Sequence, residues 1–234
     1  KLQKKQAELD KKENINPLGS CLPMLLTFPI LIIVFNAMRG AASERLVQSM
    51  LSIQHAVGDL SIENVSGIQA ALPPLSTLVE PFLWIKNLWM ADSPFTAVLP
   101  TSSSALAAIT GAIEGVISIE ELEALKSFID GGIYQQIVLP HYGATPMAGG
   151  TINLFIMQLT LYALPNGYFI LPVLSAVSQF FTTKLTSPQQ AQPEQAAGGM
   201  GGTGAFMKLF FPIFSLYICA TSNAAFSLYW VVTN

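Results

Sequence analysis

The sequence predicts an all-α fold: a polytopic bundle of transmembrane helices that carries a long, partly helical extracytoplasmic insertion. The first observation is composition, because 51% of the 234 residues are hydrophobic and only 11% are charged, against about 25% charged in ordinary soluble domains. The second is the uncharged stretch from Cys21 to Met38, which as a helix would be ~27 Å long, close to the hydrocarbon thickness of a bilayer. The third is a separation of lysines and acids along the chain.

The N-terminal part is predicted to be a helix that leads into the first membrane span. Residues 1–15 contain five lysines and no glycine or proline, which favours a solvated helix on the cytoplasmic side. Residues 16–39 form the predicted span. The Asn16-Pro17-Leu18-Gly19 turn leads into this span, and Pro29 near its middle should kink it. The sequence has no N-terminal Met and ends in an apolar run, so we expect an excerpt of a longer protein.

Residues 40–167 are predicted to be extracytoplasmic, because ten acids stand there against three bases. Helical spacing of apolar residues predicts an amphipathic helix through Leu46, Met50, Ile53 and Val57. The motif Phe82-Leu83-Trp84-Ile85 has the aromatic character of a membrane interface.

A second helix in this region is predicted from a capping box of Ser118 and Glu121. Its apolar face would carry Leu122, Leu125 and Ile129, and Gly131-Gly132 would end it. Two shorter apolar runs, 105–113 and 152–164, are expected to be interfacial, re-entrant or packed within the region.

The C-terminal part is predicted to cross the membrane three more times. Residues 168–184 form the returning span, and residues 185–204 form a flexible cytoplasmic loop rich in Gln, Pro and Gly. Residues 205–222 form the third span, and residues 223–234 begin the last one. The four spans then cross the membrane outward, inward, outward and inward in chain order, which agrees with the distribution of charge.

No catalytic or ligand-binding constellation is apparent in the sequence. His55 and His141 are far apart and have no metal-ligand spacing around them, and the phosphate-loop, zinc-protease and hydrolase motifs are missing. A net charge of −3 gives no reason to expect a nucleic-acid substrate. We therefore predict a protein that is not an enzyme and has no cofactor, no metal and no catalytic residue.

The predicted spans carry uncharged polar residues at helical spacing. Two interpretations are open: these side chains hold helices together, as small polar residues do in membranes, or they line a hydrophilic groove that receives a polar peptide segment. The candidate groove residues are Thr27, Ser175, Ser178, Gln179, Thr182, Ser215, Tyr229 and Thr233.

Four segments in order are similar to motifs of the YidC-type membrane protein insertases, which have mitochondrial and chloroplast relatives. These segments are residues 16–30, 82–88, 168–174 and 227–234. The resemblance implies five core helices with a cytoplasmic helical hairpin between the first two. Residues 1–15 would be the end of that hairpin, and the first core helix, with the family's groove arginine, would lie upstream.

The resemblance also implies a function. The family inserts proteins without nucleotide hydrolysis: a substrate's polar segment rests in a hydrophilic groove while its apolar helix passes into lipid. The expected partners are nascent membrane proteins and the lipid bilayer, in the bacterial plasma membrane. The sequence leaves open whether a Sec-type translocon and the ribosome take part.

This chain departs from the family pattern in three places. Thr27 stands where the family often has Gln, and Asn223-Ala224-Ala225 stands where it tends to have Pro-Ser-Gly. About 80 residues, 85–170, intervene where family members pass quickly from one motif to the next. Arg39 is not the counterpart of the groove arginine, since it lies at the outer end of a different span.

Two other functions fit the composition. A transporter or channel would need an ionisable residue inside a span, and the predicted spans hold none away from their ends, where Arg39, Lys184 and Lys208 lie. A structural subunit of a membrane complex would use the long outer region to bind its partner.

Overall fold

The computed structural model describes residues 22–106, 109, 113, 115–154, 157–186 and 203–234, while the side chains of residues 22–28, 154, 157, 186 and 203–208 lie outside the description. Most of the described chain is helical, as predicted. Residues 1–21, which hold the predicted hairpin end and entry turn, and residues 187–202 of the predicted loop lie outside it.

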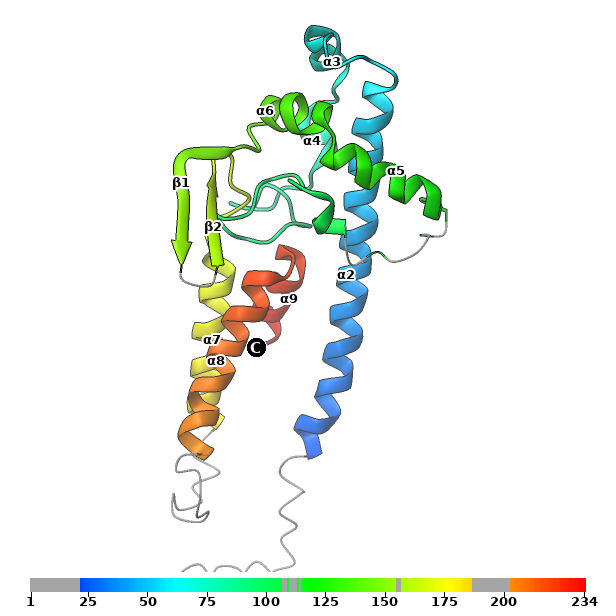
Figure 1. Cartoon of the computed structure of the whole chain (residues 1–234). Helices are drawn as coiled ribbons and strands as arrows, with labels where there is room; N and C mark the ends of the chain where they lie inside the picture. Colours follow the sequence, from blue (N-terminus) through cyan, green and yellow to red (C-terminus); the bar gives the residue numbers. More distant parts are fainter. Residues whose placement is uncertain (1–21, 107–108, 110–112, 114, 155–156, 187–202) are drawn as a thin grey trace, which may run out of the picture.

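Four helices and a cap make up the described structure (Figure 1). The helices are α2 (Leu22–Val57), α7 (Ile170–Thr186), α8 (Thr203–Thr221) and α9 (Ala224–Thr233). The cap, residues 58–169, gathers at one end of the helices, where α2 ends and α7 begins. The start of α2, the end of α7 and the start of α8 lie at the end away from the cap.

Helix α2 continues without a break through 36 residues and contains Pro29. None of its residues from 29 to 41 is buried, whereas the face formed by Leu46, Met50, Ile53 and Val57 is buried in the cap core. The predicted amphipathic helix is therefore the C-terminal part of α2, from Leu46 to Val57. Its apolar spacing is confirmed, because the same positions that repeat every three to four residues face the core.

The rest of the cap core is built on short helices: α3 (Val65–Ala71), α4 (Leu75–Leu78), the 3₁₀ helix η1 (Ser103–Leu106), α5 (Ile119–Asp130), the π-helix η2 (Tyr134–Val138) and α6 (Leu139–His141). Tyr134 is fully buried at their centre, and its hydroxyl donates to the Pro100 carbonyl at 2.7 Å. Burial raises the pKa of this phenol well above its usual value.

Helix α5 confirms the sequence prediction at both ends. The Ser118 hydroxyl accepts from the Glu121 backbone N–H at 3.2 Å, and the Glu121 carboxylate accepts from the Ser118 N–H at 2.9 Å. Leu122, Leu125 and Ile129 are buried, and the helix ends before Gly131. The apolar run 105–113 is packed in the same core through Leu106 and Ile109.

A two-stranded antiparallel sheet is the exception to the all-α prediction. Strand β1 (Pro146–Leu154) pairs with β2 (Met157–Tyr162) in the register Ile152 to Leu159, with an irregularity between residues 146 and 151. The apolar run 152–164 therefore takes part in strand pairing, and Tyr162 and Leu164 pack against the cap core, as the last of the three predicted alternatives has it. Its polar residues Gln158 and Thr160 alternate with apolar ones, which is the strand period.

Taken over the described residues, no helix combines the length and the apolar content needed to cross a membrane.

The capping box makes α5 sensitive to acid. Hydrogen bonds from the Ser118 backbone and side chain lower the pKa of the Glu121 carboxyl below its ordinary value of 4.5. A carboxyl group whose pKa is lower in the folded protein than in the unfolded chain stabilises the fold at pH values above its unfolded-state pKa. That stabilisation is lost as the pH falls through its folded-state pKa. We expect Glu121→Ala to speed amide hydrogen exchange in the first turn of α5 at neutral pH, with the difference from wild type narrowing below pH 4.5. Glu120→Ala, one residue away in the same turn, is the matched control; an equal effect of both substitutions would contradict the capping-box account.

Candidate functional site: the polar contacts of α7, α8 and α9

Helices α7 and α8 meet through two serines. The Ser175 hydroxyl donates to the Ser215 carbonyl at 3.2 Å, and the Ser215 hydroxyl donates to the Ser175 carbonyl at 3.4 Å. Both residues are fully buried, and the Trp230 indole N–H of α9 donates to the Ser215 hydroxyl. Small polar residues at a helix contact allow close approach and hydrogen bonding. These two candidate residues thus join three helices.

A third buried serine, Ser227, joins α8 and α9 nearer the cap. The Ser227 hydroxyl donates to the Cys219 carbonyl at 2.9 Å, and both side chains are buried. The turn between these helices is tight although it has no Pro or Gly. It consists of Ser222 and Asn223, and the Asn223 side chain caps α9 by accepting from the Phe226 N–H at 2.8 Å.

The remaining candidates on α7 lie further from the cap and are only half-buried. The Ser178 hydroxyl donates to the Ser175 carbonyl at 3.0 Å, and the Gln179 amide donates to the Thr183 hydroxyl at 3.5 Å. Thr182 donates to the Asn234 carbonyl at 2.9 Å, which ties α7 to the end of α9. Polarity on this face is therefore continuous, while burial decreases from Ser175 to Thr182.

The last candidates occupy different surroundings. Tyr229 is half-buried with its ring centroid 6.5 Å from that of Phe226, and Thr233 is exposed with its hydroxyl bonded to the Tyr229 carbonyl at 2.9 Å. Thr27 belongs to α2, but its side chain lies outside the described residues. Helix α2 meets α9 near the cap, where Phe35 and Phe226 make an edge-to-face contact at 5.0 Å.

Asp92, a cap residue, holds the start of α7. Its buried carboxyl group accepts the Tyr168 and Leu171 backbone N–H groups at 2.8 and 2.7 Å, and the Trp84 indole N–H at 3.2 Å. A helix N-terminus has unpaired N–H groups that such an acceptor satisfies. A Cβ at Gly167 would overlap this carboxyl group, so glycine allows the close approach.

The same cap loop also holds the start of α9. The Ala224 N–H donates to the Met90 carbonyl at 2.9 Å, and the Ala225 N–H donates to the Leu88 carbonyl at 3.0 Å. Two helix N-termini therefore receive their hydrogen-bond acceptors from residues 88–92, a segment we call the capping loop. Sequence reasoning missed this loop as part of the site.

Two buried asparagines fix the capping loop. The Asn166 side chain accepts from the Asn87 N–H at 2.8 Å and donates to the carbonyls of Asn87 and Ala91, both at 2.9 Å. The Asn87 amide in turn donates to the Val98 carbonyl at 3.0 Å. A fully satisfied buried polar network of this kind specifies one geometry.

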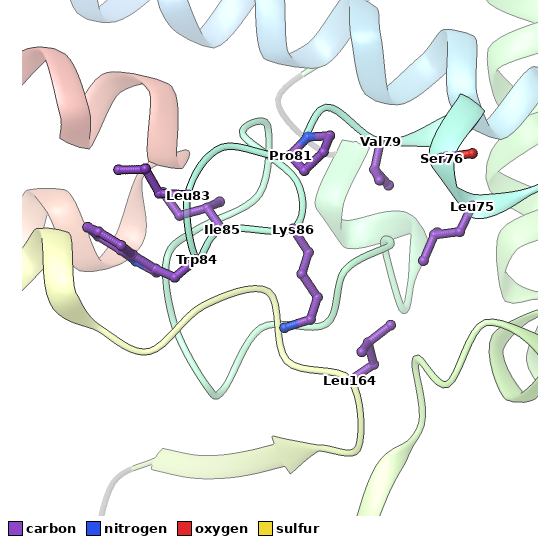
Figure 2. A pocket seen from close by; sticks show the side chains of 9 residues that line it. All are labelled: Leu75, Ser76, Val79, Pro81, Leu83, Trp84, Ile85, Lys86 and Leu164. Carbon is purple, nitrogen blue, oxygen red and sulfur yellow. The ribbon is translucent and has the colours of Figure 1, made fainter.

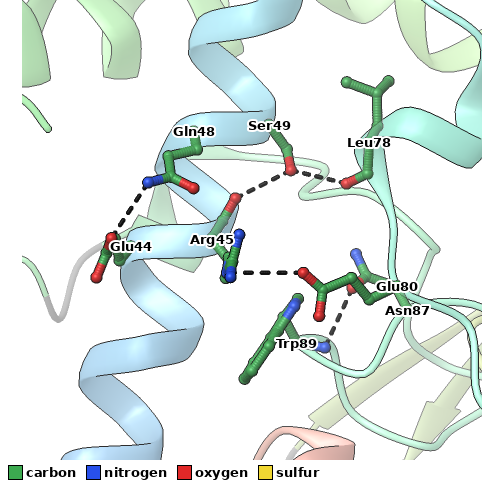
Figure 3. A network of polar contacts seen from close by, with 8 residues as sticks. All are labelled: Glu44, Arg45, Gln48, Ser49, Leu78, Glu80, Asn87 and Trp89. Carbon is green, nitrogen blue, oxygen red and sulfur yellow. Dashed lines mark hydrogen bonds and ion pairs between the residues drawn. The ribbon is translucent and has the colours of Figure 1, made fainter.

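Polar contacts with α2 attach residues 78–80, which precede the capping loop (Figure 3). The Ser49 hydroxyl donates to the Leu78 carbonyl at 2.7 Å, and Arg45 pairs with Glu80 at 3.6 Å, with both charged groups largely exposed. Figure 3 shows Trp89 beside this pair, with its backbone N–H donating to the Asn87 side chain at 3.1 Å. The exposed ion pair contributes little, about 0–1 kcal/mol, so the buried contacts carry the attachment.

The chemistry available at this site is hydrogen bonding by neutral groups. Among the described residues, the serine, threonine and glutamine side chains of the site hydrogen-bond to backbone carbonyls or to another hydroxyl. Across the part of the chain that the structure describes, no three His, Cys, Asp or Glu residues are grouped so as to hold a metal ion.

Comparison with known proteins places the chain in a family. The family model described as "60Kd inner membrane protein" matches residues 1–139 and 132–234. Inner membrane ALBINO3-like protein 2, chloroplastic, of Chlamydomonas reinhardtii is 24% identical over the whole chain, which covers 35% of that relative. The membrane protein insertase YidC of Clostridium tetani is 56% identical over 43 residues, which are 17% of this chain and 20% of the relative.

A further relative is the membrane protein insertase YidC of Pediococcus pentosaceus, 32% identical over 114 residues, with 39% of each chain covered. The chain thus spans less than half the length of these curated relatives. No solved structure matches it significantly.

These matches define the class: a family of inner membrane proteins whose curated relatives include membrane protein insertases, which are not enzymes. The chain belongs to the 60Kd inner membrane protein family, which includes the YidC and ALBINO3-like proteins. The resemblance inferred from the four sequence motifs is confirmed.

The hydrogen bonds of Asp92 predict a cost for changing it. Asp92→Asn keeps the side-chain size but replaces one acceptor oxygen with a donor, so one of the N–H groups of Tyr168, Leu171 or Trp84 loses its partner. We expect the protein in detergent to lose about 2 kcal/mol of stability, with faster hydrogen exchange at Tyr168 and Leu171. Asp59→Asn, at an exposed position of the cap, is the control. Equal thermal midpoints for both variants would contradict the role assigned to Asp92.

Proposed function

We propose that this protein is a membrane protein insertase that receives segments of nascent proteins on the polar face of α7 and α9 and releases them into lipid. The observation that carries the proposal is a gradient along α7. Near the cap, Ser175 and Ser215 are buried in mutual hydrogen bonds. Toward the far end, Ser178, Gln179 and Thr182 are half-buried polar groups. A face closed at one end and accessible at the other suits entry of a substrate from one side.

Energetics support the use of neutral polar groups. Placing polar peptide groups in hydrocarbon without partners costs several kcal/mol each, about 2–7 by transfer data. A hydrated face with Gln179 and Thr182 lowers that cost, because it offers hydrogen bonds at the depth of the membrane. Burial of the substrate's apolar helix in lipid then supplies the net driving force, so no nucleotide is needed.

The helix surfaces support placement in a membrane. Large apolar side chains are exposed on three helices away from the polar contacts. Examples are Ile33 on α2, Val177 and Phe181 on α7, and Ile213 and Tyr217 on α8. Water-soluble proteins seldom expose so many together. The proposed arrangement has four spans, with residues 1–15 and 185–204 cytoplasmic and residues 40–167 extracytoplasmic in the bacterial plasma membrane.

The proposed partners follow from the same face. Nascent membrane proteins are the substrates and the lipid bilayer is the acceptor, with no cofactor and no nucleic-acid substrate. A transporter would need an ionisable group inside the helices; among the described side chains, residues 29–38 of α2, 170–183 of α7, 209–221 of α8 and 224–234 carry none. This composition favours an insertase.

Site-specific photocrosslinking tests the proposal. A photoreactive residue at Gln179 or Tyr229 should crosslink a ribosome-bound nascent membrane protein several-fold more strongly than one at Tyr217, which is 66% exposed on the opposite flank of α8. The physical reason is that the polar face receives the substrate while Tyr217 faces lipid. No crosslink above background at either test position would overturn the groove assignment.

A paired substitution separates an insertase from a structural subunit. Gln179→Leu with Thr182→Val makes the face apolar at nearly constant volume, and we expect insertion of a substrate with a polar translocated segment to fall several-fold. Thr221→Val, at the cap end of α8, is the matched control. Unchanged insertion with the paired variant would favour a structural role.

A further inference from the structure

A shallow apolar hollow lies where the cap meets the starts of α7 and α9 (Figure 2). Its volume is about 530 Å³, within the range of roughly 300–1,000 Å³ typical of small-molecule sites. Most of its lining is aliphatic, from Leu75, Val79, Pro81, Leu83, Ile85 and Leu164. Nothing in the proposed function uses it.

One cation borders this hollow. Lys86 lines it, and Figure 2 shows its side chain extending toward Leu164. Of the three bases between residues 40 and 167, Arg45 pairs with Glu80 and Lys126 pairs with Glu123. Lys86 forms no ion pair with any described residue; its ammonium lies 5.4 Å from the Tyr168 ring centroid instead. The hollow thus offers an uncompensated positive charge beside an apolar surface.

Leu83 is held exposed at the edge of the hollow by a strained turn. Phe82 and Ile85 exchange two backbone hydrogen bonds of 2.9 Å each, so Leu83 and Trp84 form a two-residue hairpin tip. Leu83 has φ of 52°, a conformation that turns normally assign to glycine. Its side chain is 76% exposed. A strained, exposed leucine suggests that an apolar partner covers this position.

The hollow adjoins the segment that leads into α7. Tyr168 contacts Lys86 at one edge, and the exposed residues Ile170, Val173 and Leu174 follow it along the helix. If that flank faces lipid, as proposed above, a lipid beside α7 brings its headgroup to the level of Lys86. Charge and position therefore favour a lipid over a peptide as the occupant.

We propose that this hollow binds one anionic phospholipid of the outer leaflet, with its phosphate at Lys86 and its upper acyl chain over Leu83 and the aliphatic lining. The inference rests on the proposed membrane orientation. Bound there, the lipid would cover the strained tip and fill the junction between the cap and the helices.

Enrichment of anionic lipid on the purified protein measures phospholipid binding at the hollow directly. The protein is reconstituted in nanodiscs of phosphatidylethanolamine with a minority of phosphatidylglycerol, extracted mildly, and its retained lipids are quantified by native mass spectrometry. Wild type should retain phosphatidylglycerol several-fold above its bulk fraction, and Lys86→Gln should lose most of that enrichment. Lys126→Gln removes the same charge from the same cap and should leave it unchanged.

Leu83→Gly gives a second readout that a purely structural role would not produce. Glycine relieves the strained φ, so the thermal midpoint in detergent should rise, while phosphatidylglycerol retention should fall because the apolar tip is gone. A rise in both, or a fall in both, would overturn the assigned role of Leu83.

Two further results would overturn the lipid site. One is retention of phosphatidylglycerol and phosphatidylethanolamine by wild type in their bulk ratio, which would indicate an apolar surface without anion selectivity. The other is equal enrichment of phosphatidylglycerol in Lys86→Gln and wild type. Crosslinking from Gln179 in the same preparations separates the two proposals. Normal crosslinks without lipid enrichment reject the lipid site alone, and enrichment without crosslinks rejects the insertase assignment alone.

Discussion

The arrangement of the helices depends on the capping loop, residues 88–92, which supplies acceptors to two helix starts. Asp92 receives three N–H groups around the start of α7, and the carbonyls of Leu88 and Met90 receive the first N–H groups of α9. Helix N-termini leave unpaired donors that are costly to bury. Because one loop satisfies both, it fixes α7 and α9 relative to each other and to the cap.

This constraint explains why the polar face differs along its length. Near the cap, the fixed helix starts bring Ser175, Ser215 and Trp230 into a buried hydrogen-bonded contact. Further away, α7 and α9 are joined through Thr182 and the Asn234 carbonyl, and the side chains of Gln179 and Tyr229 are only half-buried. The long insertion that separates the family motifs therefore has a structural role: it closes the cap end of the helices. The proposed function uses the opposite end.

Local patterns predicted local structure well. The spacing of Leu122, Leu125 and Ile129 and the capping box of Ser118 identified α5 because these interactions lie within one or two turns. The Asp92 contacts join residues 76 and 79 apart, so no local pattern marks them. The alternation of polar and apolar residues in β2 is typical of a strand, but the apolar content of the run 152–164 favoured an interfacial, re-entrant or packed segment. Helical spacing put Ser175 and Ser215 on polar faces, but it could not show that the two face each other across α7 and α8.

The central claim is that the polar face is closed at the cap end and accessible from the other end. Labelling of single cysteines by a membrane-impermeant maleimide, in a background lacking Cys21 and Cys219, tests it most directly. The account predicts that Gln179→Cys is labelled from the cytoplasmic side and not from outside, while Ser175→Cys is labelled from neither side. Labelling of Ser175→Cys from outside, or no labelling of Gln179→Cys from the cytoplasmic side, would contradict the account.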